Sequence, residues 1–208
     1  MDFSKINSVY MLGIGGIGMS ALARYFNALG KTVAGYDKTP TMLTDELLAE
    51  NIDVHFEDDI KLIPAFVENE KAAQLLIIYT PAIPNDHGEL NYLASKFTLY
   101  KRSEILGFIT ENSNTIAVAG THGKTTTSSI ITHLFKNSGK NCSAFLGGIA
   151  KNYNSNFLLG DVQKEDHVTI VEADEFDRSF LTLHPHAAII TSMAVSYTHL
   201  RAHETLMN

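Results

Sequence analysis

The sequence predicts an α/β fold built on parallel β-sheets. Short apolar runs alternate with longer stretches of helical period, which is the pattern of successive βαβ units. Two glycine-rich segments lie where a strand passes into a helix, at the sheet edge where parallel α/β proteins bind ligands. The 208 residues, 45% hydrophobic and 19% charged, are too apolar for a disordered chain and suit one large domain or two smaller ones.

The first half of the chain supplies one set of elements. Strands are predicted over residues 8–12, 32–36, 75–79 and 98–100, each of them a short apolar run. A helix over 18–29 has its apolar residues on one stripe, and Gly30 favours its end. Thr39 and Pro40 can open a second helix that runs through residue 51, by capping and a proline in the first turn. A third helix is predicted near 89–95.

The pattern restarts after Arg102, which marks the predicted domain boundary. A helix over 103–109 leads to a strand over 115–119 and a helix over 124–137, whose inward residues are predicted to be Ile130, Ile131, Leu134 and Phe135. Strands over 143–146, 168–172 and 187–191 could join the 115–119 strand in one sheet. We therefore expect a first domain at residues 1–102 and a second at 103–193.

Charge and cysteine content exclude several classes of protein. The 16 basic residues are scattered and outnumbered by 23 acidic ones, for a net charge of −7, which argues against nucleic-acid binding. Cys142 is the only cysteine, so neither an intramolecular disulfide nor a thiolate cluster can form, and the composition fits a reducing cytoplasm. The longest uncharged apolar run, residues 9–19, is shorter than the roughly 20 residues of a membrane-spanning helix, and its glycines disfavour a signal peptide.

The first glycine-rich segment, Gly13 to Gly18, has G-x-G-x-x-G spacing between a strand and a helix. Glycine lets the backbone approach a diphosphate closely, and the free N–H groups of the helix start favour the anion. The next strand ends at Asp37, whose carboxylate could accept a hydrogen bond from a ribose hydroxyl. The predicted substrate-binding residues are Gly15, Gly16, Ile17, Gly18, Met19, Ser20 and Asp37. The motif leaves open which nucleotide binds, and a tight turn without a ligand is the alternative.

The second segment predicts a nucleoside triphosphate loop. It departs from G-x-x-x-x-G-K-[ST] because Val118 replaces the first glycine, so we expect a shorter variant. Backbone N–H groups would hold phosphate oxygens, Lys124 would reach the β- and γ-phosphates, and the Thr125 hydroxyl would ligate Mg²⁺. The predicted ATP-binding residues are Gly120, Thr121, His122, Gly123, Lys124, Thr125 and Thr126.

An acidic run follows the 168–172 strand, at the same predicted sheet edge. It holds four carboxylates: Glu172, Asp174, Glu175 and Asp177. Mg²⁺ takes one or two carboxylates plus substrate phosphates, so Glu172 at the strand end is the first candidate ligand. A solvated acidic loop is the alternative. The histidines show no metal-binding spacing, but His122 lies within the second glycine loop.

Together these segments resemble the Mur ligase family of bacterial cell-wall synthesis. The matches are Gly13-Ile-Gly-Gly-Ile-Gly-Met-Ser20, Ala119-Gly-Thr-His-Gly-Lys-Thr-Thr-Thr127, Glu172-Ala-Asp-Glu-Phe-Asp-Arg-Ser-Phe-Leu181 and Gly147-Gly148 with an Asn-rich stretch. The resemblance implies a Rossmann-like first domain for the UDP part of the substrate, followed by an incomplete P-loop ATPase α/β domain. It also implies a cytoplasmic enzyme that uses ATP and Mg²⁺ to activate a carboxylate as an acyl phosphate, which an amine then attacks.

The first loop favours, within this family, a member that joins L-alanine to UDP-N-acetylmuramate. The resemblance then makes Lys124 and His122 the candidate catalytic residues and Thr125 and Glu172 the Mg²⁺ ligands. Residues 147–156 would lie near the muramoyl group, and Arg102 with Glu104 would mark the domain junction. The nearest alternative is a muropeptide-recycling member that adds a tripeptide.

Two departures from the family pattern qualify this expectation. Residues 194–208 stand where the family carries an Asp-x-Asp-His-type motif, so we expect them to be a non-native tail. His199 is not expected to replace the metal-binding histidine of that motif. We also expect the fragment to be inactive by itself. Phe56 and Glu57 stand where many relatives carry Gly-His, which affects the uridine contacts. Two further classes stay open: a nicotinamide-dependent oxidoreductase and a non-catalytic UDP-sugar-binding module.

Overall fold

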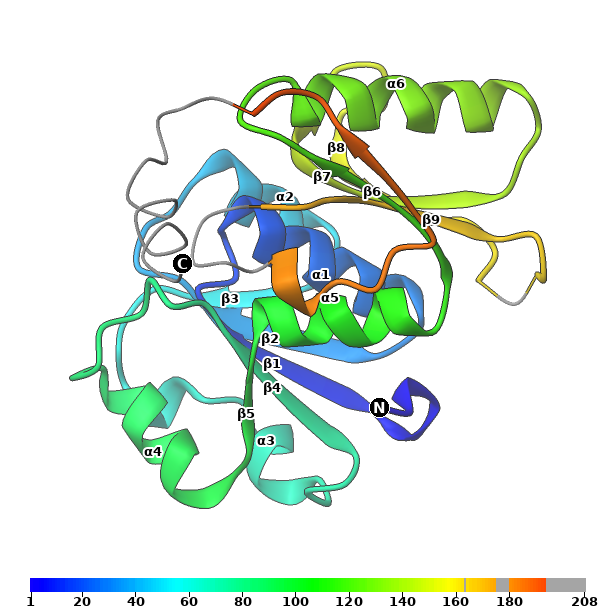
Figure 1. Ribbon diagram of the computed structural model, residues 1–208. Helices are drawn as coiled ribbons and strands as arrows, with labels where there is room; N and C mark the ends of the chain where they lie inside the picture. The colour runs from blue at the N-terminus through cyan, green and yellow to red at the C-terminus, as the bar shows by residue number, and fades with distance from the viewer. Residues whose placement is uncertain (163, 175–179, 194–208) are drawn as a thin grey trace, which may run out of the picture.

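A computed structural model describes residues 1–162, 164–174 and 180–193, and the tail 194–208 lies outside them together with Glu175 and Asp177. Two five-stranded sheets form, with strand orders β3-β2-β1-β4-β5 and β10-β6-β9-β7-β8 (Figure 1). Every pairing is parallel except the β7–β8 hairpin. The first sheet contains β1 (Ser8–Leu12), β2 (Thr32–Tyr36), β3 (Asp53–His55), β4 (Leu75–Tyr79) and β5 (Leu99–Lys101). The second contains β6 (Asn114–Ala119), β7 (Cys142–Ala150), β8 (Ser155–Leu158), β9 (Val168–Glu172) and β10 (Ala187–Ile190).

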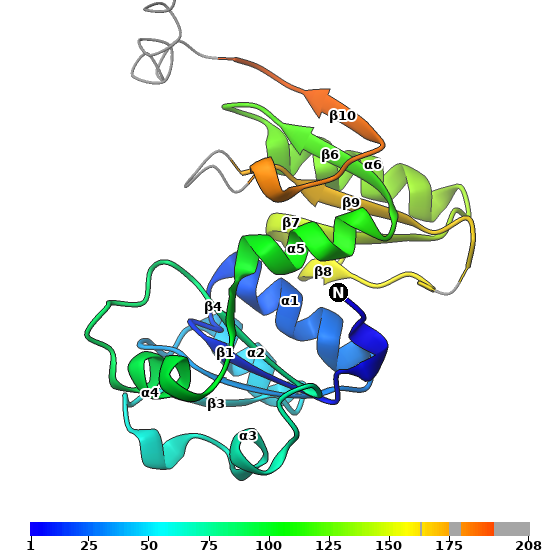
Figure 2. The same ribbon diagram turned by 60° about the horizontal axis from the view of Figure 1, so that its bottom comes forward.

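The helices lie in layers around the two sheets. They are α1 (Ile17–Ala28), α2 (Met42–Ala49), α3 (Ala65–Asn69), α4 (Gly88–Lys96), α5 (Arg102–Glu111) and α6 (Lys124–Asn137), with short 3₁₀ turns at Phe3–Lys5 and Ile60–Leu62. Helices α1 and α5 lie between the sheets, α3 and α4 cover the outer face of the first sheet, and α6 covers the outer face of the second (Figure 2). The main apolar core therefore runs through α1, which packs against both sheets.

Most predicted elements form close to their expected bounds, and the strands over 115–119, 143–146, 168–172 and 187–191 do share one sheet. The second helix begins at Met42 and not at Thr39-Pro40, because Thr41 is its N-cap. The Thr41 side chain accepts from the Thr44 N–H, and the Thr44 hydroxyl oxygen accepts from the Thr41 N–H at 2.8 Å. Strands β3 and β8 were not predicted, because each is short and has no clear alternation.

The inward face of α6 differs from the prediction. Ile131 and Phe135 do pack against the second sheet, but Ile130 and Leu134 are exposed, at 54% and 62%. The helix instead turns its hydroxyl-bearing residues Ser128 and Thr132 inward, both fully buried. Positions 128, 131, 132 and 135 share one stripe of a 3.6-residue helix, so that stripe, and not the most apolar one, faces the sheet.

A buried carboxylate lies under the outer face of the first sheet. Glu89, at the start of α4, is fully buried and accepts a hydrogen bond of 2.6 Å from the Tyr10 hydroxyl. Its other oxygen lies 2.7 Å from Nε2 of His55 at the end of β3. These contacts satisfy a group that would otherwise be costly to bury, and they fix α4 against the sheet.

No helix in the described parts of the chain is long and apolar enough to cross a membrane. Cys142 is buried at the start of β7 with a free thiol, and burial raises the pKa of that thiol. A buried thiol with a raised pKa is a weak nucleophile. We therefore interpret Cys142 as a structural residue of the second sheet and not as a reactive one.

Candidate functional site

The first glycine loop joins β1 to α1 and is stabilised by Asp37. Gly13 has φ of +84°, which a side chain would oppose, and Gly16 is the N-cap of α1. The Gly15 N–H donates to Oδ2 of Asp37 at 2.8 Å, and the Thr39 N–H donates to Oδ1 at 3.1 Å. Asp37 therefore holds the loop in shape from the end of β2, with both carboxylate oxygens engaged by backbone donors.

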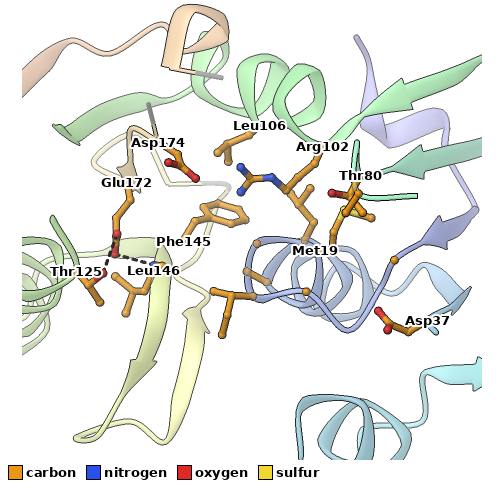
Figure 3. Close-up of a pocket in the computed structure, with 18 of the residues that line it drawn as sticks. Met19, Asp37, Thr80, Arg102, Leu106, Thr125, Phe145, Leu146, Glu172 and Asp174 are labelled. Carbon is orange, nitrogen blue, oxygen red and sulfur yellow. Dashed lines mark hydrogen bonds between the residues drawn. The ribbon is translucent and has the colours of Figure 1, made fainter. Parts of the chain in front are cut away.

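Arg102 lies directly over this loop. It is the first residue of α5, at the carboxyl edge of the first sheet, and its guanidinium extends into the space between the two sheets (Figure 3). A Cβ atom at Gly18 would lie 2.1 Å from Nη1 of Arg102. Glycine at position 18 is therefore what lets a positive charge lie against the first turn of α1, where the free N–H groups also attract anions.

The second glycine loop joins β6 to α6. Gly120 and Gly123 have φ of +125° and +82°, and Gly123 is the N-cap of α6. The Lys124 ammonium donates to the Gly120 carbonyl at 2.8 Å, so the lysine lies folded over its own loop. His122 is exposed, and its N–H donates to the Ser192 hydroxyl at 3.3 Å. The segment that follows β10 therefore supports this loop from outside.

Glu172, at the end of β9, accepts three hydrogen bonds. Its Oε2 accepts from the Thr125 hydroxyl at 2.9 Å. Its Oε1 accepts from the Ser128 hydroxyl at 2.9 Å and from the Gly147 N–H at 2.7 Å. Figure 3 shows Glu172 and Thr125 joined on one side of the pocket. The predicted pair of Mg²⁺ ligands is thus in contact, and one carboxylate with one hydroxyl is a set that fits a cation completed by phosphate oxygens.

One cavity of about 570 Å³ lies between the two sheets, and it is lined by the first glycine loop and by the first turn of α6. Eight of the predicted site residues line it: Gly16, Ile17, Gly18, Met19, Asp37, Lys124, Thr125 and Glu172. Asp174, from the acidic run, lines it as well. In the described residues we find no group of three or more histidine, cysteine or carboxylate side chains that could hold a metal ion.

The remaining predicted residues do not line this cavity. They are Gly15, Ser20, Gly120, Thr121, His122, Gly123 and Thr126. Ser20 is fully buried and accepts a hydrogen bond from Asn156, so it is part of the packing between α1 and β8. Asn156 also turns away from the cavity, whereas Gly147 lines it, so the 147–156 segment meets the site at one end only.

Several cavity residues were not predicted as site residues from the sequence. They include Lys38, Thr80, Ala82, Ile83, Arg102, Leu106, Phe145 and Leu146. Lys38 and Thr80 each follow a strand of the first sheet at its carboxyl edge, and that position was a usable signal. Phe145 and Leu146 lie within β7 and carry no local motif, so only the packing of the second sheet brings them here.

Two family models match the chain. One, described as the Mur ligase family, catalytic domain, covers residues 8–113, and the Mur ligase middle domain covers 118–208. Curated relatives named UDP-N-acetylmuramate–L-alanine ligase are 56% identical over 196 residues in Flavobacterium johnsoniae and 58% identical over 186 in Porphyromonas gingivalis. These matches cover 93% and 88% of this chain but 42% and 40% of the relatives, so the chain spans less than half of their length.

Solved structures share the fold. UDP-N-acetylmuramate-alanine ligase from Thermotoga maritima superposes with a TM-score of 0.80 at 26% identity, covering 94% of this chain and 43% of that one. UDP-N-acetylmuramate:L-alanyl-γ-D-glutamyl-meso-diaminopimelate ligase from Neisseria meningitides also has a TM-score of 0.80, at 21% identity, over 93% of this chain and 62% of that one. The α/β fold with parallel sheets predicted from the sequence is confirmed.

Proposed function

Because this chain belongs to the Mur ligase family, we propose that it carries the two nucleotide sites of an ATP-dependent ligase that joins L-alanine to UDP-N-acetylmuramate. The choice of L-alanine and of this acceptor is supported by the names of the curated relatives, of which the chain spans less than half. The muropeptide-recycling alternative uses the same nucleotide substrate and differs in the amine that is added. The single cysteine is consistent with the cytoplasm, where ATP and the nucleotide sugar are available.

One observation carries the proposal: the first glycine loop and the first turn of α6, with Lys124 and Thr125, line the same 570 Å³ cavity. A ligase of this kind must bring the carboxylate of its UDP-linked substrate to the γ-phosphate of ATP. Here the first turn of α1 with Arg102 would hold the UDP diphosphate, and the start of α6 with Lys124 would hold the triphosphate. Two anion sites that open into one cavity have a clear purpose in such a reaction.

The chemistry assigns separate roles to the residues of the second loop. A carboxylate oxygen of the muramoyl group attacks the γ-phosphorus, the bond to the β-phosphate oxygen breaks, and ADP leaves an acyl phosphate. The neutral amine nitrogen then attacks the acyl carbon and loses a proton to solvent, and inorganic phosphate leaves with the bonding electrons. Lys124 would move from the Gly120 carbonyl to the transferring phosphoryl group, where its ammonium would donate charge-assisted hydrogen bonds to phosphate oxygens. Thr125 and Glu172 would hold Mg²⁺, which neutralises phosphate charge when bound.

The nicotinamide-dependent alternative has less support. Both carboxylate oxygens of Asp37, which would have to bind a ribose, already accept backbone N–H groups of Gly15 and Thr39. An oxidoreductase would also leave the second loop and the Thr125–Glu172 pair without a purpose. A binding module that takes only a UDP-sugar has the same weakness.

Ligand binding by the 208-residue chain tests the proposal. Calorimetric titrations with UDP-N-acetylmuramate and with a non-hydrolysable ATP analogue plus Mg²⁺ should each show one site. Lys124→Ala should weaken binding of the ATP analogue by about tenfold or more, because one charge-assisted hydrogen bond is lost. The same variant should leave UDP-sugar binding unchanged. Binding of NADH in preference to both ligands would overturn the proposal.

A further inference from the structure

We propose that Ser128 is a positioning residue that determines which oxygen of Glu172 is offered to a divalent cation. This inference rests on the proposed function, since it concerns the same triphosphate site. Ser128 does not line the cavity but contacts Glu172, which does, so we expect its effect on the cation to pass through Glu172.

The two oxygens of the Glu172 carboxylate have unequal surroundings. Oε1 accepts two hydrogen bonds, from the Ser128 hydroxyl at 2.9 Å and the Gly147 N–H at 2.7 Å. Among the residues that the structure describes, Oε2 accepts a hydrogen bond only from the Thr125 hydroxyl, at 2.9 Å. Two donors on Oε1 use its lone pairs, whereas Oε2 keeps acceptor capacity beside a hydroxyl oxygen that also lines the cavity. The carboxylate is thereby set to bind a cation through Oε2 alone.

Burial makes the Ser128 contact a fixed one. The Ser128 side chain is fully buried on the face of α6 that meets the second sheet, so its hydroxyl is shielded from water. Its oxygen also lies 3.1 Å from the Thr125 carbonyl of its own helix, so the single hydroxyl proton lies between two acceptors. The contact with the ionised carboxylate is the shorter and the stronger of the two.

Gly147, in β7, also lies directly against the Glu172 carboxylate. A Cβ atom at this position would lie 2.5 Å from Oε2 and 3.1 Å from the carboxyl carbon of Glu172. The carboxylate therefore lies where any other residue would place its side chain. Ser128 and Gly147 together clamp Glu172 from two different elements, α6 and β7, which is how outer partners commonly orient a metal-binding carboxylate.

The same helix offers a matched control in Thr132. This residue is also fully buried, and its hydroxyl donates to the Ser128 carbonyl at 2.7 Å, but it makes no contact with Glu172. Thr132→Val removes a buried hydroxyl of the same kind with little change in shape. It reports what the loss of such a group does to α6 by itself.

The experiment measures affinity of the full 208-residue chain for a fluorescent, non-hydrolysable ATP analogue, with Mg²⁺ and with EDTA. The readout is the Kd measured with EDTA divided by the Kd measured with Mg²⁺, a ratio that isolates the contribution of the cation. Ser128→Ala should reduce this ratio by about tenfold, the lower end of the effect of removing an outer partner of a metal ligand. Gly147→Ala should act in the same direction, and Thr132→Val should leave the ratio unchanged.

A double-mutant cycle with Glu172→Gln completes the test. If Ser128 acts through Glu172, Ser128→Ala has no further effect on the ratio once Glu172 is replaced. A Ser128→Ala variant that weakens binding equally with Mg²⁺ and with EDTA, or leaves both unchanged, overturns the inference. If the unaltered chain binds no ATP analogue in either condition, the proposed function fails first, and the two failures are thus distinguishable.

Discussion

Asn156 and Ser20, which are 136 positions apart in the chain, are joined by a buried hydrogen bond of 2.9 Å. The Asn156 amide also donates to the Ile17 carbonyl at 2.6 Å, and its oxygen accepts from the guanidinium of Arg24. A fully buried amide of β8 thus holds the first turn of α1, next to the first glycine loop. This contact ties the second sheet directly to the predicted UDP site.

Replacing Asn156 should loosen this connection. Asn156→Ala leaves the Arg24 guanidinium without one of its partners and the Ile17 carbonyl without its side-chain donor, in a site closed to water. We expect the free energy of unfolding to fall by about 1–3 kcal/mol, the cost of leaving buried polar groups unsatisfied. Urea denaturation checks this, with exposed Asn152→Ala as the control. Equal midpoints for the two variants would contradict the prediction.

Stability should fall as the pH drops below neutrality, through His167. This histidine is buried and lies 2.8 Å from the Ser143 hydroxyl, and burial lowers its pKa below the ordinary value of 6.5. Between that lowered pKa and about 6.5, the unfolded chain binds a proton that the folded chain does not, so acid favours unfolding. The free energy of unfolding should therefore decrease from pH 7 towards pH 5. His167→Gln should show a flatter decrease, while exposed His184→Gln should follow the original slope.

Arg102 should contribute to the affinity for the UDP substrate. Its guanidinium lies against the first turn of α1 and lines the cavity. Arg102→Gln keeps much of the side-chain volume and removes the charge, so the Kd for UDP-N-acetylmuramate should rise by about tenfold to a hundredfold, as for a charge-assisted hydrogen bond. Calorimetry measures the change. Exposed Lys71→Gln, which removes one charge away from the cavity, should bind as the original chain does.

Gly120 should tolerate no side chain. Its φ of +125° is strained for other residues, and a Cβ atom there would lie 2.3 Å from the Thr191 hydroxyl oxygen and 2.8 Å from the Ser192 nitrogen. Gly120→Ala should therefore lower the thermal midpoint and weaken ATP binding together, because the loop and the end of β10 must both shift. Gly139→Ala, at φ of +72° with open space around it, separates the backbone strain from the collision.

The parts of this protein that could be predicted from sequence are those fixed by local rules. The glycines and Lys124 mark both loops, and the carboxyl-edge rule predicts that Glu172 lies near Thr125, as it does. Ser128 and Gly147 were missed as partners of Glu172, because their roles depend on how three elements pack. The inward face of α6 was predicted only in part for the same reason: Ile131 and Phe135 do face the sheet, but Ser128 and Thr132 are buried in place of Ile130 and Leu134. The roles of the predicted site residues and the boundary at residue 102 stay predictions.

The support of the second glycine loop by β10 has a consequence for local opening. In the described part of the sheet, β10 pairs only with β6, and all four of its residues are exposed. Amide hydrogen exchange should therefore be fast in β10, since exposed edge segments open with little free energy. The Thr121 amide, which donates to the Ser192 carbonyl at 3.0 Å, should lose its protection in the same opening event. A triphosphate bound to this loop would then slow amide exchange in β10, so that the exchange rate of this edge strand reports whether a nucleotide is bound.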